Sequence, residues 1–198
     1  MKEAFCAFKL EVDEVNTFYS DMQGKKVSII IPCYNQAQYV SEAIESALNQ
    51  TYQNVEIVVI NDASKDNSAD VIKSYADKYP NIIFLDEKEN KGVVKSRNLA
   101  ISKSSGDYIL PVDADDKIAS TFCEKAVKIL DSDLDIRIVY LRLKDKFETL
   151  IFDVSMHRKS DFIYLNGYKD CLSSFYRSIL NISQNKEKCI CNINLKCC

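Results

Sequence analysis

Residues 27–62, which read VSIIIPCYNQAQYVSEAIESALNQTYQNVEIVVIND, decide the fold of this chain. They open with an apolar run at 27–31, continue with apolar residues at helical spacing between 38 and 50, and close with a second apolar run at 55–60. Continuous apolar runs are typical of parallel strands buried on both faces, and apolar residues three and four apart are typical of amphipathic helices. The segment therefore predicts a strand, a helix and a second, parallel strand.

The same alternation continues further along the chain. Apolar residues between Val71 and Tyr79 indicate a helix that ends near Pro80, and the later segments predict a strand at 82–85, a helix at 92–104 and a strand at 108–112. Such alternation predicts an α/β fold with a mostly parallel sheet flanked by helices and joined by right-handed crossovers. Apolar residues at helical spacing in 1–23 predict an amphipathic helix ahead of this domain.

Composition limits the classes of partner. The chain has 198 residues, a length that suits one domain, and its net charge of -3 gives no basic surface for nucleic acid. No apolar run approaches the roughly 20 residues that a membrane span needs. The first residues carry acids, where a signal peptide has a basic and then an apolar stretch. These features predict a cytoplasmic protein without a nucleic acid partner.

The eight cysteines are unevenly distributed, and five of them lie in the tail at 171–198. Without a secretion signal, reduced thiols are expected. A zinc site in the tail is an alternative, but the tail has neither CxxC spacing nor a nearby histidine. The single histidine, His157, lies in a polar stretch and is interpreted as a surface or packing residue rather than a ligand.

Polar residues follow three of the predicted strands, at 32–35, 61–64 and 113–116. In open α/β sheets, ligands bind outside the carboxyl ends of the strands, where these three segments would meet. Turn chemistry alone is the alternative for each loop taken singly. Acids and amides rather than glycine and serine dominate the three loops together, which favours a binding site.

The segment PVDADD at 111–116 places three carboxylates in four positions at the end of an apolar run. Carboxylates so close together repel one another unless a cation lies among them, and hard oxygen ligands suit Mg²⁺ or Mn²⁺. Because these ions keep positions open for phosphate oxygens, a nucleoside diphosphate is the first ligand class to consider. The alternative is a solvated turn with Asp115 or Asp116 as a helix N-cap.

Four ordered motifs resemble the nucleotide-binding half of glycosyltransferase family 2: VSIIIPCYN at 27–35, the segment at 46–68, NKGVVKSRNLAI at 90–101 and GDYILPVDADD at 106–116. The resemblance implies a GT-A fold and inverting transfer from a nucleotide-diphospho-sugar, most commonly a UDP-sugar, with Mn²⁺ or Mg²⁺. It also implies a glycan or lipid-linked acceptor, and therefore polysaccharide synthesis with peripheral association at the inner face of the cytoplasmic membrane.

The same resemblance implies roles for individual residues in nucleotide-sugar binding. Pro32, Tyr34 and Asn35 match positions at the nucleoside pocket, where an aromatic ring can stack on the base. Asp62 matches an acid that accepts a hydrogen bond from the base, and Asn61 replaces the acid that more often precedes it.

Further matches lie in the basic segment and in the acidic motif of the family. Lys91 and Arg97 match cations that reach the base or the diphosphate, and a solvated helix surface is the alternative for both. Asp113 matches the acid that contacts ribose, and Asp115 matches the metal ligand. Asp116 is expected to cap the following helix.

The catalytic residues cannot be assigned from the sequence. Residues 153–170 resemble the acceptor-side segment, and the matching positions are Met156, Arg158, Gly167 and Tyr168. An inverting transferase needs a carboxylate base after this segment, yet Glu187 is the only acid beyond residue 170. Asp153, Asp161 and Asp170 are candidates only because they lie nearby in the sequence.

The resulting organisation has four parts: an N-terminal extension at 1–25, a nucleotide-sugar-binding domain at 26–135, a partial acceptor-side region at 136–170 and a Cys-rich tail at 171–198. A frameshift or truncation near residue 170 would explain the tail, and would leave an impaired fragment that binds nucleotide-sugar and metal. An oxidoreductase is disfavoured because GxGxxG does not follow the first strand. A nucleotidyltransferase is disfavoured because the chain has only four glycines.

Overall fold

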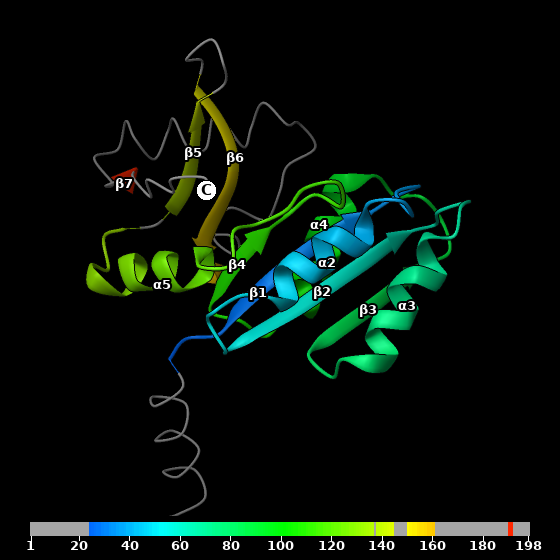
Figure 1. Ribbon diagram of the computed structural model, residues 1–198, viewed down its shortest axis with the longest axis horizontal. Coiled ribbons are helices and arrows are strands. Elements are labelled where there is room, and N and C mark those ends of the chain that lie inside the picture. The colour runs from blue at the N-terminus through cyan, green and yellow to red at the C-terminus, as the bar shows by residue number, and fades with distance from the viewer. Residues whose placement is uncertain (1–23, 137, 145–149, 161–189, 192–198) are drawn as a thin grey trace, which may run out of the picture.

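The computed structural model describes residues 24–136, 138–144, 150–160 and 190–191 (Figure 1). The strands in chain order are β1 (Val27–Cys33), β2 (Val55–Asp62), β3 (Ile82–Glu87), β4 (Tyr108–Pro111), β5 (Ile138–Lys144), β6 (Leu150–Arg158) and β7 (Ile190–Cys191). The helices are α2 (Val40–Leu48), α3 (Ser68–Lys78), α4 (Val93–Lys103) and α5 (Phe122–Ser132). The helix predicted at 1–23 lies outside the described residues.

The described strands form one sheet in the order β3-β2-β1-β4-β6-β5-β7. The neighbours β3, β2, β1 and β4 are all parallel, which confirms the α/β fold with a mostly parallel sheet. Strand β6 pairs antiparallel with both β4 and β5, and β7 pairs parallel with β5. The sheet therefore continues beyond the four predicted strands into the region at 136–170.

Helices cover both faces of the parallel strands (Figure 1). On one face, Ile29 and Ile57 belong to a buried cluster that includes residues of α2, α3 and α5. On the other face, Ile30 and Val58 pack with Ala100 of α4. Successive strand residues alternate between the two clusters, as the two-residue period of a strand requires. Burial on both faces explains why β1 and β2 have continuous apolar sequences.

Several strands extend further than the apolar runs predicted. Strand β2 continues through Asn61 and Asp62, two residues beyond the predicted end at Ile60. The reason is pairing: Asn61 and Asp62 lie opposite Asp86 and Glu87 of β3 in the parallel ladder. The polar residues after the second apolar run are thus held in strand geometry rather than in a turn.

Met156 and Arg158 of β6 match the acceptor-side segment, and their side chains contact the main core and α5. Met156 is fully buried in the main core. The Arg158 guanidinium donates hydrogen bonds to the carbonyl oxygens of Leu130 and Ile136, the latter at 3.0 Å. Cations stabilise helix C-termini because they satisfy the last carbonyls, and Leu130 is near the end of α5. Both side chains therefore stabilise the fold.

His157 is a buried packing residue, one of the two roles that the sequence allowed, and not a surface residue. Its side chain is 5% exposed, and its Nε2 lies 2.8 Å from the Ser155 hydroxyl. Burial lowers the pKa of His157 to about 3, so the imidazole is neutral at physiological pH.

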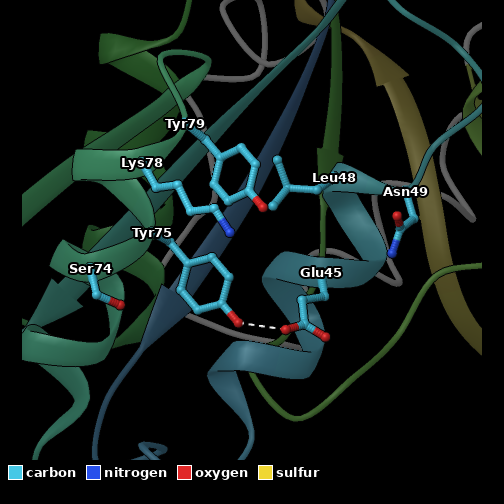
Figure 2. Close-up of a pocket in the computed structure, with 7 residues that line it drawn as sticks. All are labelled: Glu45, Leu48, Asn49, Ser74, Tyr75, Lys78 and Tyr79. Carbon is cyan, nitrogen blue, oxygen red and sulfur yellow. Dashed lines mark hydrogen bonds between the residues drawn. The ribbon is translucent and has the colours of Figure 1, made fainter.

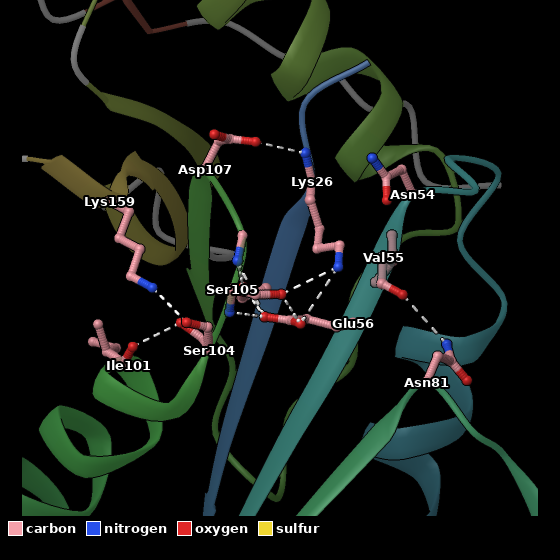
Figure 3. Close-up of polar contacts among 12 residues, drawn as sticks. Lys26, Asn54, Val55, Glu56, Asn81, Ile101, Ser104, Ser105, Asp107 and Lys159 are labelled. Atoms are coloured by element: carbon pink, nitrogen blue, oxygen red, sulfur yellow. Dashed lines mark hydrogen bonds and ion pairs between the residues drawn. The ribbon is translucent and has the colours of Figure 1, made fainter. Parts of the chain in front are cut away.

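A polar network closes the amino end of the parallel strands (Figure 3). At its centre is Glu56 of β2, which accepts hydrogen bonds from the Ser28 hydroxyl at 2.6 Å, from the Ser105 amide and hydroxyl, and from the Gly106 amide at 3.2 Å. Burial alone would raise the pKa of Glu56, but the hydrogen bonds from Ser105 and Ser28 and the charge of Lys26 lower it below the ordinary value.

Gly106 is required in this network because its backbone lies against β1. A Cβ atom at this position would be 2.7 Å from the Ser28 nitrogen and 2.9 Å from the Lys26 oxygen, closer than real Cβ contacts. The glycine that the sequence pattern marks as a helix terminator thus also permits close approach of two backbones.

Candidate functional site

A pocket of about 250 Å³ lies at the carboxyl ends of β1 and β2. Its walls come from the end of β1, the end of β2, the loop before α4 and the first turns of α4. The lining residues are Pro32, Cys33, Tyr34, Asp62, Asn90, Gly92, Val93 and Ser96. Three of the predicted nucleotide-binding residues, Pro32, Tyr34 and Asp62, are therefore in one pocket.

Asp62 organises one wall of this pocket. The residue is 3% exposed, and its two carboxylate oxygens accept hydrogen bonds from the backbone N–H groups of Lys91 at 2.8 Å and Gly92 at 2.9 Å. Gly92 has φ 82° and ψ 156°, a combination that essentially only glycine adopts. The loop before α4 can therefore present both N–H groups to Asp62 because a glycine stands at this position.

The loops after β1 and β2 are tied together by Asn35. Its side-chain oxygen accepts a hydrogen bond from the Lys65 backbone N–H at 2.8 Å, and its backbone N–H donates to the Ser64 hydroxyl at 3.0 Å. Asn35 and Ala63 both have positive φ angles, 53° and 56°. A positive φ is uncommon for a residue with a Cβ, so this pair of loops is held in a constrained conformation. Asn35 is not among the pocket-lining residues.

Asn61 uses both ends of its amide. Its Nδ2 donates to the Asp86 carboxylate at 2.8 Å, and its Oδ1 accepts from the Ser64 amide at 3.2 Å. Hydrogen bonds from Lys88 and then from Asn61 lower the pKa of Asp86. An aspartate at position 61 could not donate to Asp86, so the amide suits this chain better than the acid that the family more often has there.

The two predicted basic residues are held by acidic partners. The Lys91 ammonium pairs with Glu87, a contact that raises its pKa, and the Lys91 backbone rather than its side chain reaches Asp62. The Arg97 guanidinium pairs with Asp113, which links α4 to the end of β4. Neither cationic side chain lines the pocket.

The acidic motif forms a turn after β4. The Asp116 amide donates to the Asp113 carbonyl at 3.0 Å, and within this turn Ala114 is buried while Asp113 and Asp115 are exposed. The expectation that Asp116 caps a helix is wrong, because the next helix, α5, begins at Phe122 with Thr121 in the cap position. The Asp116 amide instead closes the turn by its bond to the Asp113 carbonyl.

The turn has a donor set that fits a hard divalent cation bound with a nucleotide. Within the described ranges, no three acidic, cysteine or histidine side chains gather as a preformed metal cage. Mg²⁺ is usually held by one or two carboxylates together with phosphate oxygens and water. Exposed Asp115 can supply such a carboxylate, with Asp113 beside it but already paired with Arg97.

Sequence reasoning missed several pocket residues, among them Cys33, Val93 and Ser96. Cys33 and Cys123 are buried free thiols, and burial raises the pKa of both. Ser96 is 1% exposed, yet it lies among polar residues of α4 in the sequence. The apolar residues of α4 show little helical periodicity, so the sequence did not indicate which face of the helix Ser96 occupies.

A second pocket, of about 580 Å³, lies between α2 and α3, away from the carboxyl edge (Figure 2). The Tyr75 hydroxyl donates to Glu45 at 2.6 Å across it, and this hydrogen bond, with burial, raises the pKa of Tyr75 to about 12. The pocket contains none of the residues predicted to bind nucleotide-sugar. Its volume is larger, but the chemistry expected of the site is absent from its walls.

Other predicted residues lie outside the described part of the chain. These are the base candidates Asp161 and Asp170, the matched positions Gly167 and Tyr168, and most of the tail cysteines. Asp153 is in β6, and only the backbone of this residue is described. None of the helices in the described ranges has the length and apolar character to cross a membrane.

The sequence profile of glycosyl transferase family 2 matches residues 28–187. The chain belongs to this family. The matched range includes the parallel strands, the pocket and part of the Cys-rich tail beyond residue 170.

Among curated relatives, glycosyltransferase GlyA of Streptococcus pneumoniae is 36% identical over 114 residues, 57% of this chain and 16% of that protein. The minor teichoic acid biosynthesis protein GgaB of Bacillus subtilis is 40% identical over 106 residues, 52% of this chain and 12% of that protein. The chain thus spans only a small part of the length of these relatives.

Two solved structures are similar in fold. The mannosyltransferase PcManGT of Pyrobaculum calidifontis, in complex with GDP-Man and Mn²⁺, has a TM-score of 0.76 at 20% identity over 86% of this chain and 55% of that chain. S. aureus TarS 1–349, in complex with UDP-GlcNAc, has a TM-score of 0.63 at 22% identity over 71% of this chain and 47% of that chain. These similarities support the GT-A fold.

Proposed function

We propose that the chain binds a nucleotide-diphospho-sugar, with a UDP-sugar as the first candidate, and transfers the sugar with inversion to a glycan or lipid-linked acceptor. The observation that carries this proposal is the pocket at the carboxyl edge, which contains Asp62, Pro32 and Tyr34, while the acidic turn follows β4, the strand beside β1. Family membership supports the reaction class, and the nucleotide-sugars bound by PcManGT and TarS support the donor class.

In the proposed binding mode, the nucleoside enters the pocket and the diphosphate extends toward the turn at 113–116. Asp62 accepts a hydrogen bond from the base, and the exposed ring of Tyr34 stacks against it. Asp113 contacts the ribose, and Asp115 would hold Mn²⁺ or Mg²⁺. When bound, the cation would neutralise charge that develops on the departing nucleoside diphosphate.

A second candidate is a chain that binds nucleotide-sugar without transferring the sugar. The described carboxylates near the pocket favour it, because the proposed binding mode uses Asp62 for the base, Asp113 for the ribose and Asp115 for the cation. A general base must reach the acceptor hydroxyl within hydrogen-bond distance, and these three acids are all assigned to the donor. Transfer would then depend on a carboxylate from residues outside the described ranges.

Calorimetry with UDP in the presence and absence of Mn²⁺, followed by assays of donor hydrolysis and transfer, tests the proposal. Metal-dependent UDP binding with turnover supports the transferase, and binding without turnover supports the binding-only candidate. Failure to bind UDP and GDP would contradict both. For a transferase acting on lipid-linked acceptors, we also expect a cytoplasmic enzyme that binds peripherally to the inner face of the membrane.

A further inference from the structure

The hydroxyl of Ser96 is a buried polar group without a hydrogen-bond partner in the part of the chain that the structure describes. Ser96 is 1% exposed and lines the pocket at the carboxyl edge. Within the described residues, its Oγ makes no hydrogen bond. A buried hydroxyl without a partner destabilises the fold, so such a group in a native protein calls for an explanation.

The local structure of α4 does not supply that explanation. A serine in a helix can satisfy its hydroxyl by donating to a carbonyl one turn earlier. Ser102 on the same helix does so, with its Oγ 2.7 Å from the Leu99 oxygen. The Ser96 amide bonds the Gly92 carbonyl at 3.1 Å, but its hydroxyl has no such bond. The Ser96 hydroxyl therefore has no partner within the described residues, in a side chain that lines the pocket.

Asp62, in the same pocket, has acceptor capacity to spare. An ionised carboxylate offers about four lone-pair positions. Among the described residues, Asp62 accepts two hydrogen bonds, from the amides of Lys91 and Gly92. One pocket thus holds an acceptor with free lone pairs and a hydroxyl free to donate.

We propose that Ser96 is a specificity-determining residue, whose hydroxyl donates a hydrogen bond to a nucleobase carbonyl next to the N–H that Asp62 accepts. This inference rests on the proposed function and adds a requirement: an N–H beside a C=O on the base edge. Uracil and guanine have this edge. Cytosine presents an unprotonated ring nitrogen in its place, which would face the Asp62 carboxylate with like polarity.

The test compares Ser96→Ala with wild type and with the matched control Ser102→Ala on the same helix. Binding of UDP, GDP and CDP is measured by calorimetry with Mn²⁺, and the melting temperature of each free protein is measured in parallel. We expect Ser96→Ala to weaken UDP or GDP binding about tenfold, which corresponds to one neutral hydrogen bond. Its melting temperature without ligand should equal or exceed that of wild type, because an unpartnered buried hydroxyl is removed.

The outcomes separate the inference from the proposed function. Wild type that binds neither UDP nor GDP would overturn the proposed function. Wild type that binds either, with unchanged affinity in Ser96→Ala, would overturn the inference alone, as would CDP binding as tight as UDP binding. A lowered melting temperature of ligand-free Ser96→Ala would assign the serine a structural role and would also overturn it. The UDP and GDP arms show which base the pocket accepts.

Discussion

Strand β2 carries a buried carboxylate at each end, and the two serve different purposes. Glu56 at the amino end is 7% exposed, and Asp62 at the carboxyl end is 3% exposed. Glu56 accepts four hydrogen bonds from Ser28, Ser105 and Gly106, whereas Asp62 accepts two among the described residues, from Lys91 and Gly92. Burial is nearly equal, so the number of satisfied lone pairs distinguishes the two acids.

The difference separates a structural end of the sheet from the end at which we propose that the nucleotide binds. At the amino end, the protein itself fills the acceptor positions of Glu56, and the backbone of Gly106 lies directly against β1. At the carboxyl end, a pocket adjoins Asp62, and a loop held by backbone amides leaves part of the carboxylate unused. A buried acid marks a ligand site only where its acceptor capacity is incompletely used.

The largest effect is expected from Glu56→Ala. Loss of the carboxylate leaves the Ser28 hydroxyl and the Ser105 amide and hydroxyl without this acceptor, while the Gly106 amide keeps its bond to the Ser28 hydroxyl at 2.8 Å. Hydrogen bonds to charged groups contribute about 1.5–3 kcal/mol each, but they are not additive, so we expect the free energy of unfolding to fall by about 4 kcal/mol. Urea denaturation measures this change in the free energy of unfolding.

Glu56→Gln is a milder substitution that tests the same contacts if Glu56→Ala does not fold. It should lose less stability and should bind UDP with wild-type affinity, because the amino end is remote from the pocket. Weakened UDP binding by a folded Glu56→Gln protein would contradict the division between the two ends.

Asp62→Asn should mainly weaken UDP binding, whereas the Glu56 variants should mainly lose stability. The amide retains one acceptor oxygen and introduces an NH₂ group that opposes the Lys91 or Gly92 amide, so the loop loses support. We expect UDP affinity to fall about 30-fold, or about 2 kcal/mol, since a charged hydrogen bond to the base is also lost. Calorimetry measures the affinity.

Asp107→Asn is the matched control for this substitution. Asp107 also accepts a hydrogen bond from a backbone amide, that of Lys26 at 2.9 Å, but it does so at the amino end. Its replacement should leave UDP affinity unchanged. Equal losses of affinity in the two variants would show that Asp62 acts through general stability rather than through the pocket.

Much of this comparison follows from sequence, and part of it does not. The apolar runs at β1 and β2 predict parallel strands, and parallel strands bring their carboxyl ends to one edge, so the sequence alone is enough to group Pro32, Tyr34 and Asp62 there. The pairing of Arg97 with Asp113 was not predictable in this way. It depends on how closely α4 approaches the end of β4, which local patterns do not specify.

The sequence also did not predict which atoms of a residue make its contacts. Lys91 matches a cation for the nucleotide, yet its backbone amide supports Asp62 while its side chain pairs with Glu87. A sequence identifies the type of residue but not which of its groups makes the contact. Strands β5 and β6 were not predicted individually, and Arg158 matches the acceptor side although it satisfies carbonyls near the end of α5.

Gly92→Ala should have a smaller effect on stability that is coupled to binding. Among the described residues beyond its chain neighbours, no atom lies within 4 Å of the position of an added Cβ, so the cost arises from backbone strain at φ 82°. Strain of this kind costs about 1–3 kcal/mol, and relief of the strain would move the Gly92 amide away from Asp62. We expect a loss of about 1.5 kcal/mol in unfolding free energy with weakened UDP binding. Reduced stability with wild-type affinity would show that the amide is not needed to shape the pocket.

The smallest effect concerns the pH dependence of stability. Because the folded-state pKa of Glu56 is lowered, the unfolded state takes up its proton first on acidification, and stability is lost as pH falls below about 4.5. His157 adds a loss in the same direction, since its pKa falls from 6.5 to about 3 on burial and the unfolded state binds the proton between these values.

The difference in unfolding free energy between wild type and Glu56→Gln isolates the glutamate, because the His157 contribution is common to both. Denaturation at a series of pH values from 7 to 3 should show this difference shrinking below about pH 4.5, the ordinary pKa of the glutamate. A difference that stayed constant over the series would mean that the folded and unfolded states hold the Glu56 proton equally. The hydrogen bonds at the amino end would then stabilise the charged and the protonated forms of Glu56 equally.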